Sequence, residues 1–111
     1  MSGIQADERR EHARFPIHCT LEVLGRDQVQ PVRLLDISGG GFRFEAEAEF
    51  RPETLIRLIL DFFPVDIPLR ALVAWVKPAP EGRFEHGAEF VNLPRAERSL
   101  LRDFIHESQE P

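Results

Sequence analysis

One short segment of the chain, residues 36–41, joins an acid, a hydroxyl and three consecutive glycines in the order Asp-Ile-Ser-Gly-Gly-Gly. The carboxylate of Asp36 and the hydroxyl of Ser38 can form hydrogen bonds, and a glycine-rich turn exposes backbone N–H groups without side-chain obstruction. In a chain of this composition the pattern DxSxxG is expected only ~0.01 times by chance. The same residues also suit a tight β-turn, in which Asp and Ser bond neighbouring backbone and glycine supplies a positive φ. Taken alone, the segment favours the turn over a binding site.

A second candidate element is the pair Arg10 and Arg14, an RxxxR pattern that Arg9 directly precedes. Arginine binds anionic oxygens through a fork of parallel hydrogen bonds. The chain has 14 Lys and Arg residues, all but one of them arginine, so about 1.5 such pairs are expected by chance. Arg98 and Arg102 form another one. The spacing by itself therefore carries little weight.

The sequence contains no GxSxG, Walker A, HExxH or GxGxxG pattern, so we expect no catalysis. The single cysteine, Cys19, has no disulfide partner and is expected to be a buried small hydrophobe. Three acids that share one strand face, Glu45, Glu47 and Glu49, are better explained by a solvated surface than by a cation site. The histidines lack metal-ligand spacing, so we expect no metal site and assign them to the surface or to packing. They are His12, His18, His86 and His106.

Trp75 is the only tryptophan of the chain and lies near the end of a run with strand character. An exposed indole at that place can stack on a purine base. Packing in the core is the favoured interpretation, because large aromatic side chains are buried on average.

Six short runs with strand character follow one another between residues 15 and 92. The clearest alternates Phe42 and Phe44 with Arg43 and Glu45, a period of two that gives one buried and one solvated face. A polar turn at residues 25–28 joins the first two runs into a hairpin. The runs span residues 17–23, 32–37, 42–49, 55–63, 67–76 and 84–91, and prolines at the edges of the fourth and fifth are expected to limit how far these strands extend. This pattern predicts a mainly β fold, a closed or nearly closed six-stranded antiparallel barrel.

The periodicity changes after residue 92. Pro94 suits the first turn of a helix, and an apolar stripe at helical spacing follows, made of Leu100, Leu101, Phe104 and Ile105. Residues 93–108 are therefore expected to form a helix that packs on the barrel of residues 15–92. Residues 1–14 lack apolar periodicity and are expected to form a flexible arm. We expect residues 1–111 to form a single domain.

The composition, 42% hydrophobic and 30% charged, is that of a globular protein. The formal net charge of -5 disfavours general binding of DNA or RNA, which requires many basic contacts to phosphates. No apolar run reaches the ~18 residues that span a bilayer, and the N-terminus lacks the apolar core of a signal peptide. We therefore expect a cytoplasmic protein that does not insert into membranes, by default a monomer.

The order of the motifs resembles the PilZ domain family. An RxxxR pair in an N-terminal arm is followed by DxSxxG and then by Gly-Phe-Arg-Phe, which opens a strand. The resemblance extends over essentially the whole chain and includes a late Gly-Ala-Glu-Phe strand at residues 87–90 and the closing helix. It implies a PilZ-like barrel that binds the bacterial second messenger cyclic di-GMP, without any other cofactor.

The resemblance also implies a role for each motif residue. The arginines bind the Hoogsteen edge of guanine or a phosphate, and the acid accepts hydrogen bonds from guanine N1 and N2. The serine and the glycine turn bind a phosphate or a base. In this family RRxxxR is associated with an intercalated pair of nucleotides, so two per chain are expected. The residues are Arg9, Arg10, Arg14, Asp36, Ser38, Gly39, Gly40 and Gly41.

The signalling role follows from the arm. Nucleotide that bridges the arm to the turn would order the arm and create a surface for a partner protein, in control of motility, biofilm formation or exopolysaccharide production. A constitutive protein adaptor without nucleotide dependence stays open as an alternative. A small nucleic-acid-binding barrel is a second alternative, which the acidic charge balance opposes.

Overall fold

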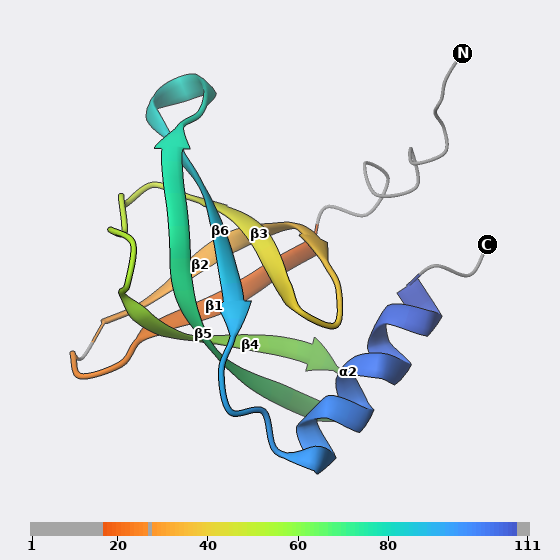
Figure 1. The fold of residues 1–111 in the computed structure, drawn as a ribbon. Coiled ribbons are helices and arrows are strands. Elements are labelled where there is room, and N and C mark those ends of the chain that lie inside the picture. Colours follow the sequence, from red (N-terminus) through yellow and green to blue (C-terminus); the bar gives the residue numbers. More distant parts are fainter. Residues whose placement is uncertain (1–16, 27, 109–111) are drawn as a thin grey trace.

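The computed structural model of the chain describes residues 17–26 and 28–108. Its strands are β1 (Ile17–Val23), β2 (Gln28–Ile37), β3 (Gly41–Ala46), β4 (Leu55–Phe62), β5 (Val65–Pro78) and β6 (Phe84–Phe90). All pairs are antiparallel, and the strands close into a barrel in the order β1-β2-β3-β6-β5-β4 (Figure 1). This confirms the fold class that the alternation predicted.

The alternation of side chains along each strand, with a period of two, determines which side chains point into the barrel. In β3, Phe42 and Phe44 are buried, whereas Arg43 between them is exposed. Cys19 in β1 is only 6% exposed, which confirms its expected place in the core. Burial, together with the charge of Asp61, raises the pKa of the Cys19 thiol to about 12, so the sulfur stays protonated and unreactive at neutral pH.

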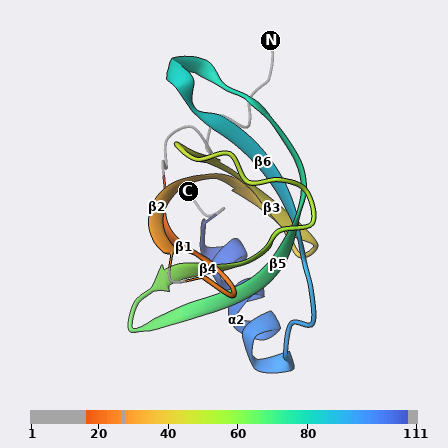
Figure 2. The same cartoon turned by 90° about the vertical axis from the view of Figure 1, so that its left-hand side faces the viewer.

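The helix α2 (Arg95–Ser108) packs at one end of the barrel. Its Leu101 and Phe104 are buried, and the Phe104 ring meets Phe62 of β4 edge-on at 5.6 Å. The β5–β6 hairpin, which carries the short helix η1 (Pro80–Gly82), projects from the opposite end (Figure 2). Within the residues that the structure describes, no helix is long and apolar enough to cross a membrane.

Strand β5 is longer than the expected run of residues 67–76, although prolines stand at both of its ends, Pro64 just before it and Pro78 as its last residue. It runs from Val65 to Pro78 and contains Pro68 in its interior. Pro68 lies opposite Ile59 of β4, and the pairing of β5 with β6 begins only at Ala71. Within the described residues, the other edge of β5 therefore has no strand partner at Pro68, and a residue without an N–H is tolerated there.

Candidate functional site

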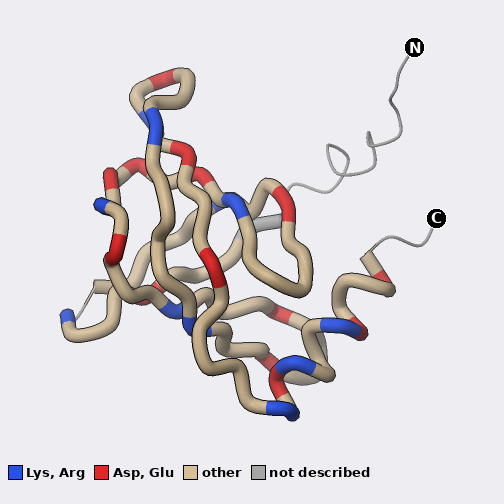
Figure 3. Tube along the Cα trace, viewed as in Figure 1, with Lys and Arg blue, Asp and Glu red and all other residues tan. Residues whose placement is uncertain are grey.

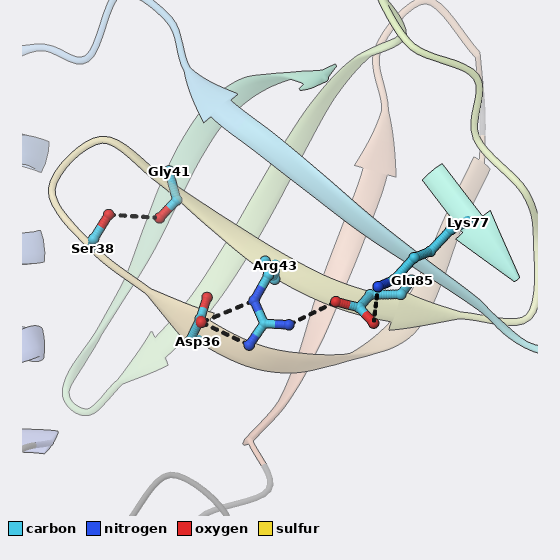
Figure 4. Close-up of polar contacts among 6 residues, drawn as sticks. All are labelled: Asp36, Ser38, Gly41, Arg43, Lys77 and Glu85. Carbon is cyan, nitrogen blue, oxygen red and sulfur yellow. Dashed lines mark hydrogen bonds and ion pairs between the residues drawn. The ribbon is translucent and has the colours of Figure 1, made fainter. Parts of the chain in front are cut away.

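The glycine-rich segment forms the tight connection between β2 and β3. The Ser38 N–H donates to the Gly41 carbonyl at 2.8 Å, and the Ser38 hydroxyl donates to the same carbonyl at 3.4 Å (Figure 4). This hydroxyl also accepts from the Gly40 N–H at 3.3 Å. Ser38 thus bonds neighbouring backbone, as a structural turn requires. The positive φ expected of a glycine is not found, because none of the three glycines adopts one.

The glycines of this turn have different surroundings. A Cβ added at Gly39 or Gly40 would meet nothing within 4 Å, so their backbone is open to solvent and to a ligand. A Cβ at Gly41 would collide with the backbone carbonyl of Ala88 in β6. The Gly40 carbonyl accepts the Phe90 N–H at 3.0 Å, which attaches the turn to the end of β6. Gly41 is therefore required by packing, whereas Gly39 and Gly40 leave an accessible surface.

Asp36 is held by Arg43, a residue that the motifs did not predict. A register shift between Leu34 and Asp36 places Asp36 opposite Arg43 on the outer face of the barrel. The Arg43 Nε and Nη2 atoms lie 2.9 and 2.8 Å from Oδ2 of Asp36 (Figure 4). These hydrogen bonds raise the pKa of the Arg43 guanidinium above its already high ordinary value. The outward position of Arg43 follows from the alternation of β3, but its partner follows only from the register shift.

The ion pairs continue across the barrel surface. Nη1 of Arg43 donates to Oε2 of Glu85 in β6 at 2.6 Å, and Nζ of Lys77 in β5 lies 3.9 Å from Oε1 of the same carboxylate. The ammonium of Lys77 also lies 5.7 Å from the ring centroid of Trp75. Four strands, β2, β3, β6 and β5, are thus connected by one row of charged side chains.

Trp75 lies on the outer surface, with 38% of its area exposed, so the favoured prediction of core packing is wrong. A register shift between Val73 and Trp75 places the residue opposite Gly87 of β6. A Cβ at Gly87 would overlap three atoms of the indole ring, which shows that the ring lies over the Gly87 backbone. The bulge and the missing side chain together make room for the indole outside the barrel.

An open pocket of about 540 Å³ connects the β2–β3 turn with Trp75. The predicted site residues that line it are Asp36, Ser38, Gly40, Gly41 and Trp75. Arg43, Gly87, Glu89 and Phe90 belong to the same wall and were not predicted. Gly39 lies exposed in the turn beside the pocket. The predicted arm residues Arg9, Arg10 and Arg14 lie outside the described residues.

A larger depression of about 660 Å³ lies elsewhere on the barrel and contains none of the predicted site residues. Its Arg83 is paired with two of the acids expected on the outer face, Glu45 at 3.3 Å and Glu47 at 3.7 Å. The side chain of Glu47 is 89% exposed, as expected for a solvated surface. The smaller pocket is therefore the better candidate site, because it gathers the motif residues.

The wall of the candidate pocket has little free positive charge. Its Arg43 is already bonded to Asp36 and Glu85, and Lys77, which lies near the pocket without lining it, is beside Glu85. Acidic and basic residues are interspersed along the barrel in the view of Figure 3. A phosphate that binds here would need cations from outside the described wall.

The first residue of β1, Ile17, pairs with Leu34 of β2, two positions before Asp36. The chain therefore enters the barrel close to the strand end that carries the motif acid. In the sequence, the last arginine of the RxxxR pair, Arg14, stands three positions before Ile17.

Beneath the pocket wall, the neighbour of Gly87 in β6 is a buried histidine. Nε2 of His86 accepts the Phe50 N–H at 3.0 Å, and the imidazole stacks on the Phe44 ring at 4.5 Å. The side chain is fully buried, so of the two roles expected for the histidines, at the surface or in packing, His86 has the packing role. Burial lowers the pKa of His86, an effect that outweighs the nearby carboxylates of Glu49 and Glu85.

We expect His86 to make the fold acid-sensitive. Above the ordinary pKa of 6.5 the neutral imidazole contributes its full stabilisation. Below that pH the unfolded chain binds a proton that the folded chain does not, so the free energy of unfolding falls by up to about 1.4 kcal/mol per pH unit, until the folded-state pKa is reached. Urea unfolding of the wild type and of His86→Gln, from about pH 7.5 to about pH 5, measures this effect.

The glutamine variant is the reference because its amide oxygen can accept the Phe50 N–H without titrating in this range. The wild type should lose more stability on acidification than the variant. Parallel pH dependences of the two proteins would show that His86 does not cause the loss.

Comparison with known proteins identifies a family. The model of the PilZ domain matches residues 8–107. A search of curated protein sequences finds no match. Among solved structures, the inhibitor of motility MotI/DgrA of Bacillus subtilis superimposes with a TM-score of 0.68 at 15% identity, covering 86% of this chain and 47% of that one.

Two further structures share the fold. The PilZ domain of CeSA from a cellulose synthesizing bacterium has a TM-score of 0.66 at 12% identity, and the match covers 86% of this chain and 95% of that domain. MrkH of K. pneumonia in its apo state has a TM-score of 0.64 at 13% identity, with 84% and 46% covered. The chain thus spans about half the length of MotI/DgrA and MrkH and nearly all of the CeSA domain.

Proposed function

Because the chain belongs to the PilZ domain family, we propose that it is a receptor that binds cyclic di-GMP in the pocket between the β2–β3 turn and Trp75. PilZ domains are binding domains rather than enzymes. The observation that carries the proposal is the pocket itself, because it gathers the acid, the hydroxyl and the open glycine turn of one motif on the same face as an exposed indole.

The groups in the pocket suit a guanine base. Both contacts from Arg43 use Oδ2 of Asp36, which leaves Oδ1 to accept hydrogen bonds from the N1 and N2 donors of guanine. The exposed face of Trp75 offers a surface on which a purine can stack, an interaction worth about 1–3 kcal/mol. The open backbone at Gly39 and Gly40 can approach a phosphate or a base closely.

The two phosphates of the ligand need positive charge that the pocket wall does not offer. Among the described residues, Arg43 is the basic residue of this wall, and both Arg43 and the neighbouring Lys77 are already in contact with carboxylates. We assign this role to Arg9, Arg10 and Arg14, which precede a strand that starts beside the Asp36 end of β2. Guanidinium groups bind phosphate and the Hoogsteen edge of guanine through paired hydrogen bonds. Three arginines would suit an intercalated pair of nucleotides, so we propose two per chain.

The proposed output is a change in the arm. Nucleotide that bridges the arginines to the turn would order the segment before Ile17 and create a surface for a protein partner. We place this receptor in the bacterial cytoplasm, in control of motility, surface attachment or exopolysaccharide production.

Titration calorimetry with cyclic di-GMP tests the proposal. The wild type should bind with a saturable heat whose stoichiometry gives the number of nucleotides per chain. Arg10→Ala and Asp36→Ala should each weaken binding by at least about tenfold, because a hydrogen bond to a charged group contributes about 1.5–3 kcal/mol.

Arg102→Ala is the matched control. It belongs to the second RxxxR pair of the chain, yet its side chain lies in α2 and bonds Ser99 at 3.3 Å. This variant should bind like the wild type. Absence of binding by the wild type, or the same affinity in all four proteins, would refute the proposed function.

A further inference from the structure

We propose that Arg43 is a positioning residue that sets the orientation of Asp36 toward the guanine base, an inference that rests on the proposed function. Arg43 lies outside the two motifs, and each of its three guanidinium nitrogens already donates to a carboxylate. It therefore acts on the ligand through Asp36.

The geometry fixes the acid on one side only. Two nitrogens of Arg43 converge on Oδ2 of Asp36, at 2.9 and 2.8 Å, so the other oxygen, Oδ1, is the one presented to a ligand. A carboxylate held in this way cannot turn about its terminal bond without losing both hydrogen bonds. Oδ1 keeps its acceptor sites for the N1 and N2 donors of guanine.

Glu85 fixes Arg43 in turn. Its Oε2 accepts from Nη1 at 2.6 Å, and its side chain is only 16% exposed, against 44% for Arg43. Lys77 lies 3.9 Å from the second oxygen of Glu85 and 5.7 Å from the Trp75 ring. The guanidinium is thus held from both sides, and the row of charges connects the acid at one end of the pocket with the indole at the other.

Arg43 also balances charge. An unpaired carboxylate at Asp36 would stand close to the phosphates of the bound nucleotide, and the two negative groups would repel each other. Removal of Arg43 should therefore weaken binding in two ways, through a misdirected carboxylate and through added repulsion. Both effects require that Asp36 be present.

A double-mutant cycle measured by calorimetry with cyclic di-GMP tests this dependence. In the wild-type background, Arg43→Leu should reduce the affinity about tenfold or more. In the Asp36→Ala background, the same substitution should reduce the affinity less than about twofold. Cyclic di-IMP, which lacks the 2-amino group of guanine, gives a second readout. The wild type should prefer cyclic di-GMP, and Arg43→Leu should lose most of this preference.

Arg83→Leu is the matched control, because Arg83 also lies on the outer face and contacts two carboxylates but does not line this pocket. It should bind like the wild type. Arg43→Lys keeps the charge without the fork and should fall between the wild type and Arg43→Leu, and thermal unfolding confirms that each variant is folded.

Equal losses in both backgrounds would show that Arg43 contacts the nucleotide directly and would overturn the inference. Wild-type affinity and base preference in Arg43→Leu would do so as well. In either case the proposed function stands, provided that the wild type binds and Asp36→Ala binds more weakly. A wild type that fails to bind would instead overturn the proposed function, and this inference with it.

Discussion

Replacing Gly41 with alanine is expected to destabilise the barrel by about 1–3 kcal/mol. The new Cβ would collide with the Ala88 carbonyl, a backbone atom that cannot move without displacing β6. β3 and β6 pair from Gly41 onward, so the first position of this pairing would have to open. Urea unfolding followed by the fluorescence of Trp75, the only tryptophan, measures the loss.

Gly40→Ala provides the comparison within the same turn. Its Cβ would enter open space, and the residue does not require a positive φ, so the change should stay within about 0.5 kcal/mol. A similar destabilisation in both variants would contradict the separate roles given to these glycines. With the expected result, the last glycine of DxSxxG serves the fold, and its neighbours are free to serve the ligand.

Replacing Gly87 with alanine should reduce the affinity for cyclic di-GMP about tenfold or more while it leaves the fold largely intact. The added Cβ would overlap the indole of Trp75, a side chain that can turn away, so the ring rather than the backbone gives way. Stacking of a base on an aromatic ring contributes about 1–3 kcal/mol, and a displaced ring loses it. Calorimetry gives the affinity, and the emission maximum of Trp75 reports the displacement.

Trp75→Ala measures how much the indole contributes to the affinity for cyclic di-GMP. It should weaken binding as much as Gly87→Ala does, and the double variant should show no further loss, because both changes remove the same stacking surface. Wild-type affinity in Gly87→Ala, together with a shifted Trp75 emission, would show that the indole does not stack on the ligand.

The barrel could be predicted from the sequence because the alternation of buried and exposed residues in each strand is a local pattern. Alternation such as that of Phe42, Arg43 and Phe44 follows from one buried and one solvated face, and six such runs with turns between them suffice for the fold class. The apolar stripe that includes Leu101 and Phe104 identified the helix for the same reason. Strand ends were less predictable, since the tolerance for Pro68 depends on which strand lies beside it.

The candidate site was only partly predictable. The composition of residues 36–41 indicates an unusual turn. The different roles of Gly40 and Gly41, however, depend on the carbonyl of Ala88, which is far away in the sequence. The pairing of Asp36 with Arg43 depends on a register shift that no local pattern reveals.

The sequence favours the core for Trp75, because an aromatic residue in an apolar strand is normally buried. Its outward position results from a second register shift, in β5, and from the space above Gly87 in β6. A glycine at the centre of a strand is a signal of close approach that the sequence did contain. To predict which side chain fills the space above Gly87, one must also know the strand order of the closed barrel.

The most direct test of the central claim uses the fluorescence of Trp75 during a titration with cyclic di-GMP. This single tryptophan lines the pocket and is 38% exposed, so its emission reports on the proposed binding site alone. Binding between the turn and the indole predicts a saturable change in emission that Asp36→Ala weakens and Arg102→Ala does not. Unchanged emission at nucleotide concentrations that saturate the calorimetric signal would place the ligand elsewhere and contradict the account.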